Sequence, residues 1–382
     1  MDFRENVVSL ARAPRGKQRD GFMEDPNNLN NASKEPLTAA ISDMNCPKFS
    51  ELWKPKNTLG RLQKVATFGS CFAQNLGPAL KEQGYTWFDA EPAPDIFVPE
   101  IKKKYNYGVF SARTGNINTA AALRQWVSWA LGVETPPEEI WHKGGRFFDP
   151  FRPSIEPNGF ATPEELLASR NAVLRAIRKI AERTDWFVFT LGQTEGWVNS
   201  SSGYIYAMAP GNIAREFDSN DHLLKNYSFP EVRADLNWVI DAICGINKKV
   251  RFVLTVSAIP LTEADSGNHA IAATPLPQSL LREAALTIAK SRKIVDYFPS
   301  YEIITGAPLR AMLYEPNEQA VPKPGAEFAT YCFFGSLAGS SRDVPPVVEL
   351  GNAVNDSRSD AHEAKELWSR ILKTRNTLRD LM

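Results

Sequence analysis

Apolar positions between residues 65 and 298 form two kinds of segment that alternate along the chain. Short runs rich in β-branched and aromatic residues predict strands that are covered on both faces, and longer runs with apolar residues at helical spacing predict amphipathic helices. The expected strands span 65–68, 85–89, 186–191, 250–256 and 294–298, and the expected helices span 72–83, 117–131, 162–184, 230–247 and 277–291.

Turn and cap residues support these boundaries. Gly84 follows the first expected helix, as a C-cap glycine does. Thr162 precedes Pro163 and stands three residues before Glu165, which is the pattern of an N-cap, a first-turn proline and a capping box. Because helices long enough to cross a sheet separate the strands, the pattern predicts right-handed crossovers and a parallel sheet, which is an α/β fold.

The remaining segments are expected to flank this α/β unit. Residues 1–48 are polar and lack an apolar period, which predicts a partly disordered leader before an α/β domain over 49–305. A small hairpin is expected at 204–209. Residues 306–382 are expected to decorate the domain: 306–355 are rich in Pro, Gly and Ser with little periodicity, and 360–381 form a charged amphipathic helix.

Composition restricts the classes of function. The 44 basic and 44 acidic residues give a formal net charge of zero, which disfavours a nucleic-acid partner because such binding requires clustered basic charge. No apolar run is long enough to span a membrane, and the N-terminus lacks the apolar core of a signal peptide. The 4 cysteines are irregularly spaced, so we expect no disulfide framework, no metal and a cytoplasmic location. The oligomeric state stays open.

Candidate chemistry begins at Gly69-Ser70-Cys71, where the first expected strand passes into the first expected helix. Backbone N–H groups at a helix N-terminus lack intrahelical partners, and the helix dipole is positive there, so this turn favours an anion such as a thiolate. Cys71 is therefore a candidate nucleophile, with Ser70 as the alternative. The competing interpretation is that Cys71 is a small buried residue that closes the turn.

Further polar residues follow the other expected strands. In an open parallel sheet, ligands bind outside the carboxyl ends of the strands, where Thr194, Glu195, His269 and Glu302 would join the first turn. A nucleophile, an imidazole and a carboxylate are the parts of an acyl-transfer triad. Among the 4 histidines, only His269 follows an expected core strand.

Two further positions have both a functional and an ordinary interpretation. Gly115 and Asn116 precede a helix and could present an N–H and an amide to an oxyanion, or they could simply form a turn and an N-cap. Arg152, in an aromatic loop, could bind an anionic substrate group or be a surface charge without a role.

Several blocks of sequence together resemble one protein family. The resemblance rests on the blocks Phe68–Ala73 (FGSCFA), Thr190–Glu195 (TLGQTE), Leu254–Ser257, Gly267–His269 and Asp296–Glu302. They resemble the GSCFA family, which looks like a branch of the SGNH/GDSL hydrolases. The resemblance implies a flavodoxin-like three-layer sandwich with a central parallel sheet, decorated by insertions and a C-terminal helix.

The resemblance also implies roles for individual residues. Cys71 stands at the nucleophilic serine of the SGNH pattern, and Ser70 stands at the preceding aspartate. Thr194 stands where an asparagine would donate to the oxyanion, which is a departure, and Gly115 matches the glycine of a second block weakly. The usual late Asp-x-x-His block is missing, so the implied histidine is His269.

The acid that orients His269 is left open between Glu302 and Asp265. The expected function is acyl transfer by an esterase or acyltransferase on a small-molecule or glycan ester, with acyl-CoA as a possible co-substrate and no bound cofactor. Bacterial relatives of this branch look like polysaccharide-modifying enzymes, so an acylated carbohydrate is the expected substrate. The alternative is a non-catalytic protein that binds a glycan or nucleotide. A dinucleotide site is disfavoured because the second and third glycines of its fingerprint are missing after Gly69.

Overall fold

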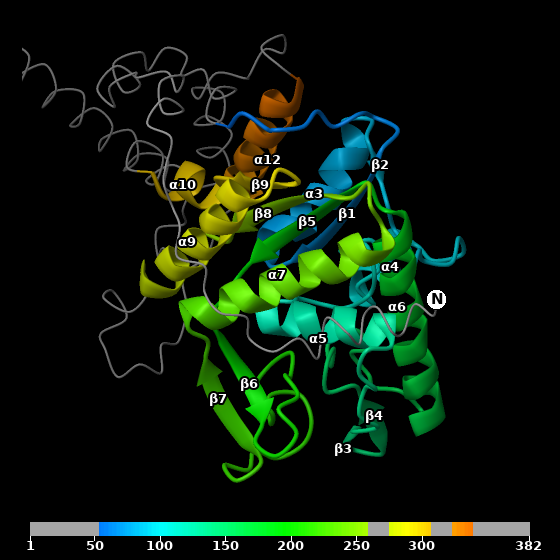
Figure 1. The fold of residues 1–382 in the computed structure, drawn as a ribbon. Coiled ribbons are helices and arrows are strands. Elements are labelled where there is room, and N and C mark those ends of the chain that lie inside the picture. Colours follow the sequence, from blue (N-terminus) through cyan, green and yellow to red (C-terminus); the bar gives the residue numbers. More distant parts are fainter. Residues whose placement is uncertain (1–52, 259–274, 307–322, 339–382) are drawn as a thin grey trace, which may run out of the picture.

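The computed structural model describes residues 53–258, 275–306 and 323–338. Strands and helices alternate through most of this part of the chain (Figure 1). The strands are β1 (Lys64–Gly69), β2 (Thr86–Trp87), β3 (Trp141–Lys143), β4 (Arg146–Phe148), β5 (Trp186–Leu191), β6 (Glu195–Asn199), β7 (His222–Asn226), β8 (Arg251–Val256) and β9 (Val295–Phe298). The helices are α3 (Cys71–Glu82), α4 (Pro99–Lys104), α5 (Ala120–Leu131), α6 (Pro163–Arg183), α7 (Phe229–Ile246), α9 (Pro275–Ser291), α10 (Ser300–Thr305) and α12 (Lys323–Ala338).

The described residues contain a five-stranded parallel sheet in the order β2-β1-β5-β8-β9. The chain therefore places β2 on one side of β1 and then continues on the other side with β5. This change of direction between β1 and β5 is a topological switch point, where ligands bind in open α/β sheets. The α/β fold predicted from the apolar pattern is confirmed.

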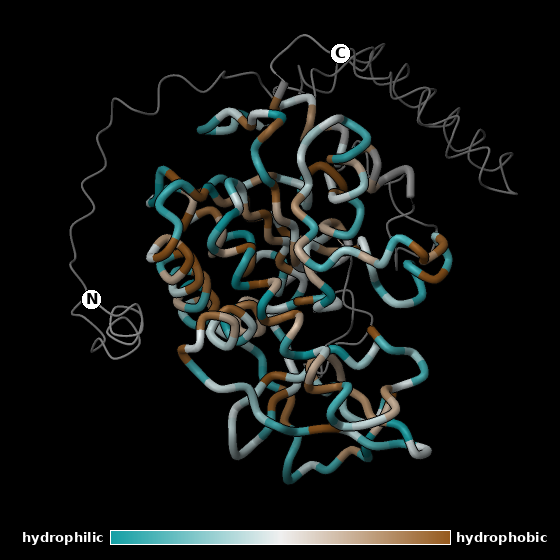
Figure 2. The backbone as a smooth tube through the Cα atoms, turned by 90° about the vertical axis from the view of Figure 1, so that its right-hand side faces the viewer, coloured by the Kyte–Doolittle hydropathy of each residue, from teal (hydrophilic) through white to brown (hydrophobic). Residues whose placement is uncertain are grey.

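Helices cover both faces of the sheet because its strands are apolar at nearly every position. In β5, Phe187 and Phe189 pack into the cluster that contains α5, α6, α7 and α9. The intervening residues Trp186 and Val188 pack into a second cluster with α3, α10 and α12. Figure 2 shows hydrophobic segments through the middle of the molecule with hydrophilic segments around them.

Most predicted elements match the structure within a few residues, but two regions differ. The hairpin expected at 204–209 is instead formed by β6 and β7, which pair in antiparallel fashion and extend away from the central sheet (Figure 1). The interval 306–355, for which no periodic element was predicted, contains α12. Its Phe328 and Phe333 are each 1% exposed in the second cluster. The predicted leader at 1–48 and the predicted helix at 360–381 lie outside the described residues.

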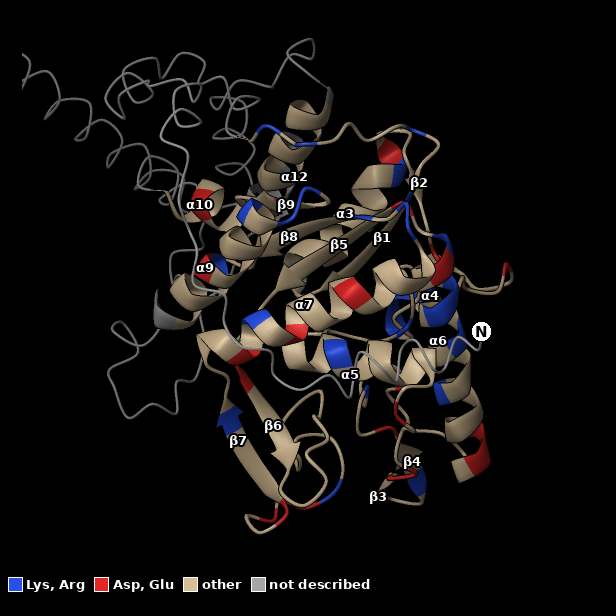
Figure 3. Cartoon of the chain, viewed as in Figure 1, with Lys and Arg blue, Asp and Glu red and all other residues tan. Residues whose placement is uncertain are grey.

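Charged residues of both signs are distributed over the outer helices and loops (Figure 3). The short helix α4 carries Lys102, Lys103 and Lys104 in its last turn, where cations complement the negative end of the helix dipole. Over the stretches of chain that the structure covers, no helix is long and apolar enough to cross a membrane.

Candidate active site

The turn between β1 and α3 lies against the end of β5. Gly69 has φ +125°, and a Cβ at this position would stand 2.2 Å from the Thr190 carbonyl oxygen. The next residue, Ser70, donates its N–H to the same carbonyl at 3.1 Å. Glycine is therefore required at position 69, because only a residue without a Cβ allows the two strand ends to approach this closely.

Ser70 is the N-cap residue of α3, but its side chain does not cap the helix. The residue is 4% exposed, and its Oγ has no hydrogen-bond partner within the described residues. A buried hydroxyl without a partner is uncommon in proteins, because it loses its hydrogen bonds to water without replacement. The Ser70 hydroxyl is therefore a buried polar group at the positive end of α3 whose hydrogen bonds no described residue satisfies.

The segment before α5 crosses this turn. Ile117 donates its N–H to the Gly69 carbonyl at 3.0 Å, and the Asn118 carbonyl accepts the N–H groups of Gly192 and Gln193, each at 2.9 Å. These bonds join residues that follow β1, precede α5 and follow β5. Three segments distant in the sequence thus meet at the switch point of the sheet.

Gly192 marks a second close approach among these segments. A Cβ on Gly192 would stand 3.1 Å from the Ser70 Cβ and 3.2 Å from the Asn118 Oδ1. The Ser70 and Asn118 side chains therefore border the same small space above Gly192. The atom of Asn118 at this contact is the acceptor Oδ1, so its Nδ2 would donate to an oxyanion beside Ser70 after the amide rotates.

A pocket of about 300 Å³ opens next to this space. It lies between the segment before α5, the residues that follow β5, the start of β6 and the stretch 205–212. Asn118 lines the pocket, and Asn116 at its rim accepts a hydrogen bond from Gln74 Nε2 of α3 at 2.7 Å. The pocket is thus connected both to the Ser70 turn and to the first turns of α3.

The predicted oxyanion residues occupy different places around this pocket. Asn116 and Glu195 line it, and Glu195 accepts a hydrogen bond from Asn226 Nδ2 at 3.2 Å. Gly115 is buried with φ +67°, so it forms the turn that brings the chain to the pocket. Thr194 is 1% exposed and is not among the lining residues, although both of its neighbours are.

Asn118 was not singled out by the sequence analysis, which selected the right segment but the neighbouring asparagine. The available signal was the helix start. Thr119 is the N-cap of α5, and its side chain accepts the Ala122 N–H at 3.1 Å. A threonine N-cap at 119 would have placed Asn118 immediately before the helix, at the carboxyl edge of the sheet.

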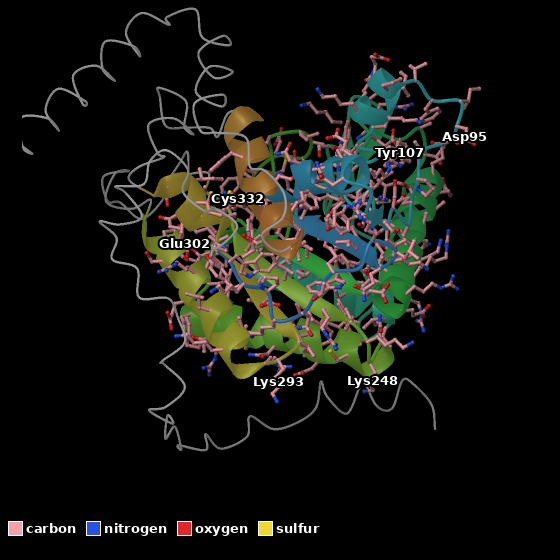
Figure 4. All side chains as sticks on the ribbon, turned by 90° about the horizontal axis from the view of Figure 1, so that it is seen from above. Asp95, Tyr107, Lys248, Lys293, Glu302 and Cys332 are labelled. Atoms are coloured by element: carbon pink, nitrogen blue, oxygen red, sulfur yellow. The ribbon has the colours of Figure 1, made fainter. Side chains whose placement is uncertain are left out.

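The candidate acid Glu302 lies in the first turn of α10 (Figure 4). Its carboxylate forms an ion pair with Arg282 and accepts the Tyr297 hydroxyl at 2.9 Å and 3.1 Å. Burial, together with the Glu302 charge, raises the pKa of Tyr297, so this phenol remains a donor. A carboxylate can accept about four hydrogen bonds, so the donors Arg282 and Tyr297 leave room for a further donor.

The other candidate triad residues are Cys71, His269 and Asp265. The backbone of Cys71 begins α3, directly after the Ser70 N-cap. His269 and Asp265 lie outside the described residues. The structure therefore brings Ser70 and the start of α3 together with Asn118, and the histidine and the acid of the predicted triad remain predictions.

Arg152 is neither a surface charge nor a group free to bind a substrate, which corrects both interpretations drawn from the sequence. Its side chain is 0% exposed and forms an ion pair with Asp149 at 2.9 Å, so it is not a surface charge. Its remaining nitrogens donate to the Arg113 carbonyl and the Ser169 hydroxyl, which leaves the guanidinium committed to the protein interior rather than to a substrate. Burial opposes the Asp149 charge, but Arg152 and Arg170 outweigh it and hold the pKa of that carboxyl below its ordinary value.

Within the described residues, no group of three or more His, Cys, Asp or Glu side chains could hold a metal ion.

A family profile described as the GSCFA family matches residues 64–333, which is more than half of the chain. No curated protein matches the sequence. A solved crystal structure is similar at 17% identity over 44% of this chain and 71% of that chain, with a TM-score of 0.25 that is too low to carry an argument.

Proposed function

The chain belongs to the GSCFA family, and we propose that it is an acyl-transfer enzyme of SGNH type, an ester hydrolase or an O-acyltransferase. The observation that carries the proposal is the buried Ser70 hydroxyl at the N-terminus of α3, which has no partner among the residues that the structure describes and lies beside the Asn118 amide and a pocket. An acyl-transfer site needs a nucleophile, donors aimed at an oxyanion and a cavity for the substrate. The position of the Ser70 turn, the Asn118 side chain and the pocket at the switch point of the sheet supports this proposal.

The strand order supports the SGNH-type part of the proposal. The order β2-β1-β5-β8-β9 is that of flavodoxin-like doubly wound sheets, in which ligands bind at the carboxyl ends on either side of the first strand. The family resemblance assigns the nucleophile to the turn after this strand. The turn at Ser70 and Cys71 occupies that place in the present chain.

The reaction proceeds through two acyl transfers. In the first, the Cys71 thiolate attacks the ester carbonyl, the carbon–sulfur bond forms, and His269 gives its proton to the departing alcohol oxygen. In the second, His269 takes a proton from water or from an acceptor hydroxyl, whose oxygen attacks the thioester and releases Cys71. Donors from Asn118 and the α3 N-terminus stabilise the oxyanion in both steps. Water as the acceptor makes the protein an esterase, and a hydroxyl acceptor makes it an acyltransferase.

Ser70 is the alternative nucleophile, and its buried hydroxyl without a partner is a specific observation in its favour. In that variant of the mechanism, His269 removes the hydroxyl proton, and Cys71 only closes the turn. The orienting acid is Glu302 or Asp265. If it is Glu302, the His269 ring donates to a free acceptor position of this carboxylate beside Arg282 and Tyr297.

Hydrolysis of p-nitrophenyl acetate, combined with mass spectrometry of the acyl-enzyme, tests the proposal. We expect an acetyl adduct on the peptide that contains Cys71, and a loss of at least about 100-fold in kcat for Cys71→Ala and for His269→Ala. Cys244→Ala is the matched control and should keep full activity, because this half-buried cysteine lies on α7 away from the turn. If Ser70→Ala abolishes turnover while Cys71→Ala retains it, the nucleophile is Ser70. The enzyme proposal fails if no adduct forms and none of these variants changes the rate.

A further inference from the structure

The pocket beside Ser70 has a chemical character that indicates one class of ligand. Its floor is aromatic, since Trp126 and Phe151 are each 2% exposed and Tyr206 is 3% exposed. Tyr206 and Phe151 stack with ring centroids 6.1 Å apart. The Tyr206 hydroxyl is held away from a ligand, because it donates to the Glu139 carboxylate and accepts from Asn199 Nδ2 at 3.1 Å. The floor is therefore a preformed apolar surface.

The wall of the pocket carries amides rather than charges. Asn118, Gln193 and Asn212 line it, and their side chains form no hydrogen bonds with any residue that the structure describes. Each amide offers two donors and one acceptor. Three lining amides without a partner among the described residues match a ligand whose groups both donate and accept, as neighbouring hydroxyls do.

Ionic ligands do not suit this pocket. No lysine, arginine or histidine is among its lining residues, and its acidic side chain, Glu195, would repel a phosphate. Phosphate recognition in proteins uses arginine, lysine or convergent backbone N–H groups. Trp197 is half-buried at the rim, where an indole face can pack against the C–H groups of a sugar ring.

We infer that this pocket binds the alcohol part of the substrate, and that this part is a neutral carbohydrate. The inference rests on the proposed function for its link to an ester, and it adds that an acyl-CoA or nucleotide does not occupy this pocket. Asn118 lines the pocket and also meets Ser70 over Gly192, so a sugar in the pocket lies beside the proposed reacting centre.

Isothermal titration calorimetry of the full chain tests the inference with N-acetylglucosamine and cellobiose as neutral probes, and with glucose 6-phosphate and coenzyme A as anionic probes. We expect a neutral sugar to bind, and both anionic probes to bind at least tenfold more weakly. Gln193→Ala and Asn212→Ala should each weaken sugar binding by about five- to tenfold, because each removes one hydrogen bond from a preformed site. Asn237→Ala is the matched control, since this asparagine lies on α7 and its amide bonds to the Arg233 carbonyl.

The same samples separate this inference from the proposed function. Absence of sugar binding alongside normal hydrolysis of p-nitrophenyl acetate overturns the carbohydrate inference and leaves the acyl-transfer proposal standing. Sugar binding that depends on Gln193 and Asn212, without any turnover, supports a neutral-carbohydrate pocket and contradicts both the enzyme and the assignment of the sugar as its alcohol. Tighter binding of coenzyme A than of the sugars, with the same dependence on Asn212, also overturns the inference.

Discussion

Substitution of Gly192 by alanine tests whether Ser70 and Asn118, which meet over this glycine, lie at the reacting centre. The new methyl group would stand 3.1 Å from the Ser70 Cβ and 3.2 Å from the Asn118 Oδ1. Nonbonded carbon atoms are most favourably placed about 3.5–4.0 Å apart, so at least one neighbour must move by about half an ångström. Both neighbours belong to the proposed site, which makes the perturbation local to it.

The expected effect on activity follows from this displacement. A misplacement of about 1 Å in an active site can cost about 100-fold in rate, so half that distance corresponds to about tenfold, or roughly 1.4 kcal/mol in the activation barrier. Overpacking of this kind costs about 1–3 kcal/mol of stability, which leaves a protein of ordinary stability folded. We therefore expect kcat/KM for p-nitrophenyl acetate to fall by about tenfold while the protein remains native by circular dichroism.

Gly245→Ala provides the matched control. Gly245 lies inside α7, and a Cβ there meets no atom within 4 Å. Alanine should preserve the rate and should leave the helix equally or more stable, since glycine is a poor helix former. Wild-type kcat/KM for Gly192→Ala, measured with the two variants side by side, would refute the assignment of the reacting centre to the space between Ser70 and Asn118.

Three further predictions concern buried groups outside the pocket. Asp149→Ala should lower the free energy of unfolding in urea by about 3–5 kcal/mol, because it leaves Arg152 and Arg170 buried without their shared counter-ion; a loss below 1 kcal/mol would contradict this role. Burial, together with the nearby Arg215, lowers the pKa of His222 below its ordinary value of 6.5. As the pH falls, the unfolded chain therefore binds a proton at this histidine before the folded chain does. The free energy of unfolding should keep the full contribution of His222 above pH 6.5 and decrease as the pH falls below that value. His222→Phe should flatten this dependence between pH 7.5 and 5.5, and an unchanged slope would assign it to other groups. Burial raises the pKa of Cys332 to about 12, so this thiol should resist iodoacetamide at pH 8 in the native protein and react only after unfolding; rapid native labelling of its peptide would contradict the buried position.

The apolar pattern predicted the sheet well because each core strand is buried on both faces. In runs such as Trp186–Leu191 and Arg251–Val256, alternate side chains pack against helices on opposite faces of the sheet. Nearly every residue of such a run is therefore apolar, and this continuous apolar run is visible in the sequence. The helix α12 escaped prediction for the opposite reason. Its own apolar residues are spread around the helix with little preference for one face, so they give no helical period in the sequence. Pro and Gly near its start are residues typical of a loop.

The candidate site was predictable only in part, because its geometry depends on contacts between distant segments. The turn at Gly69 and Ser70 follows from the local pattern of strand, glycine and helix. The approach of Asn118 to Gly192 does not, since it arises from hydrogen bonds between the segment before α5 and the segment after β5. Arg152 shows the same limit: a sequence cannot show that a guanidinium meets a buried carboxylate three residues earlier and is thereby removed from substrate binding.

The two sides of the pocket depend on different parts of the fold. The reacting side is fixed by the central sheet, where the Ser70 N–H bonds to the end of β5. The far wall comes from the irregular stretch before β7, which Gln125 of α5 holds through a reciprocal pair of bonds with the Ile205 backbone, at 2.8 Å and 2.9 Å. A sheet edge gives a nucleophile one rigid position, whereas a loop fastened at a few points can change its lining side chains without disturbing the sheet. In the proposed mechanism, β1, β5 and α3 would therefore position the reacting groups, and the segment between β5 and α7 would select the alcohol.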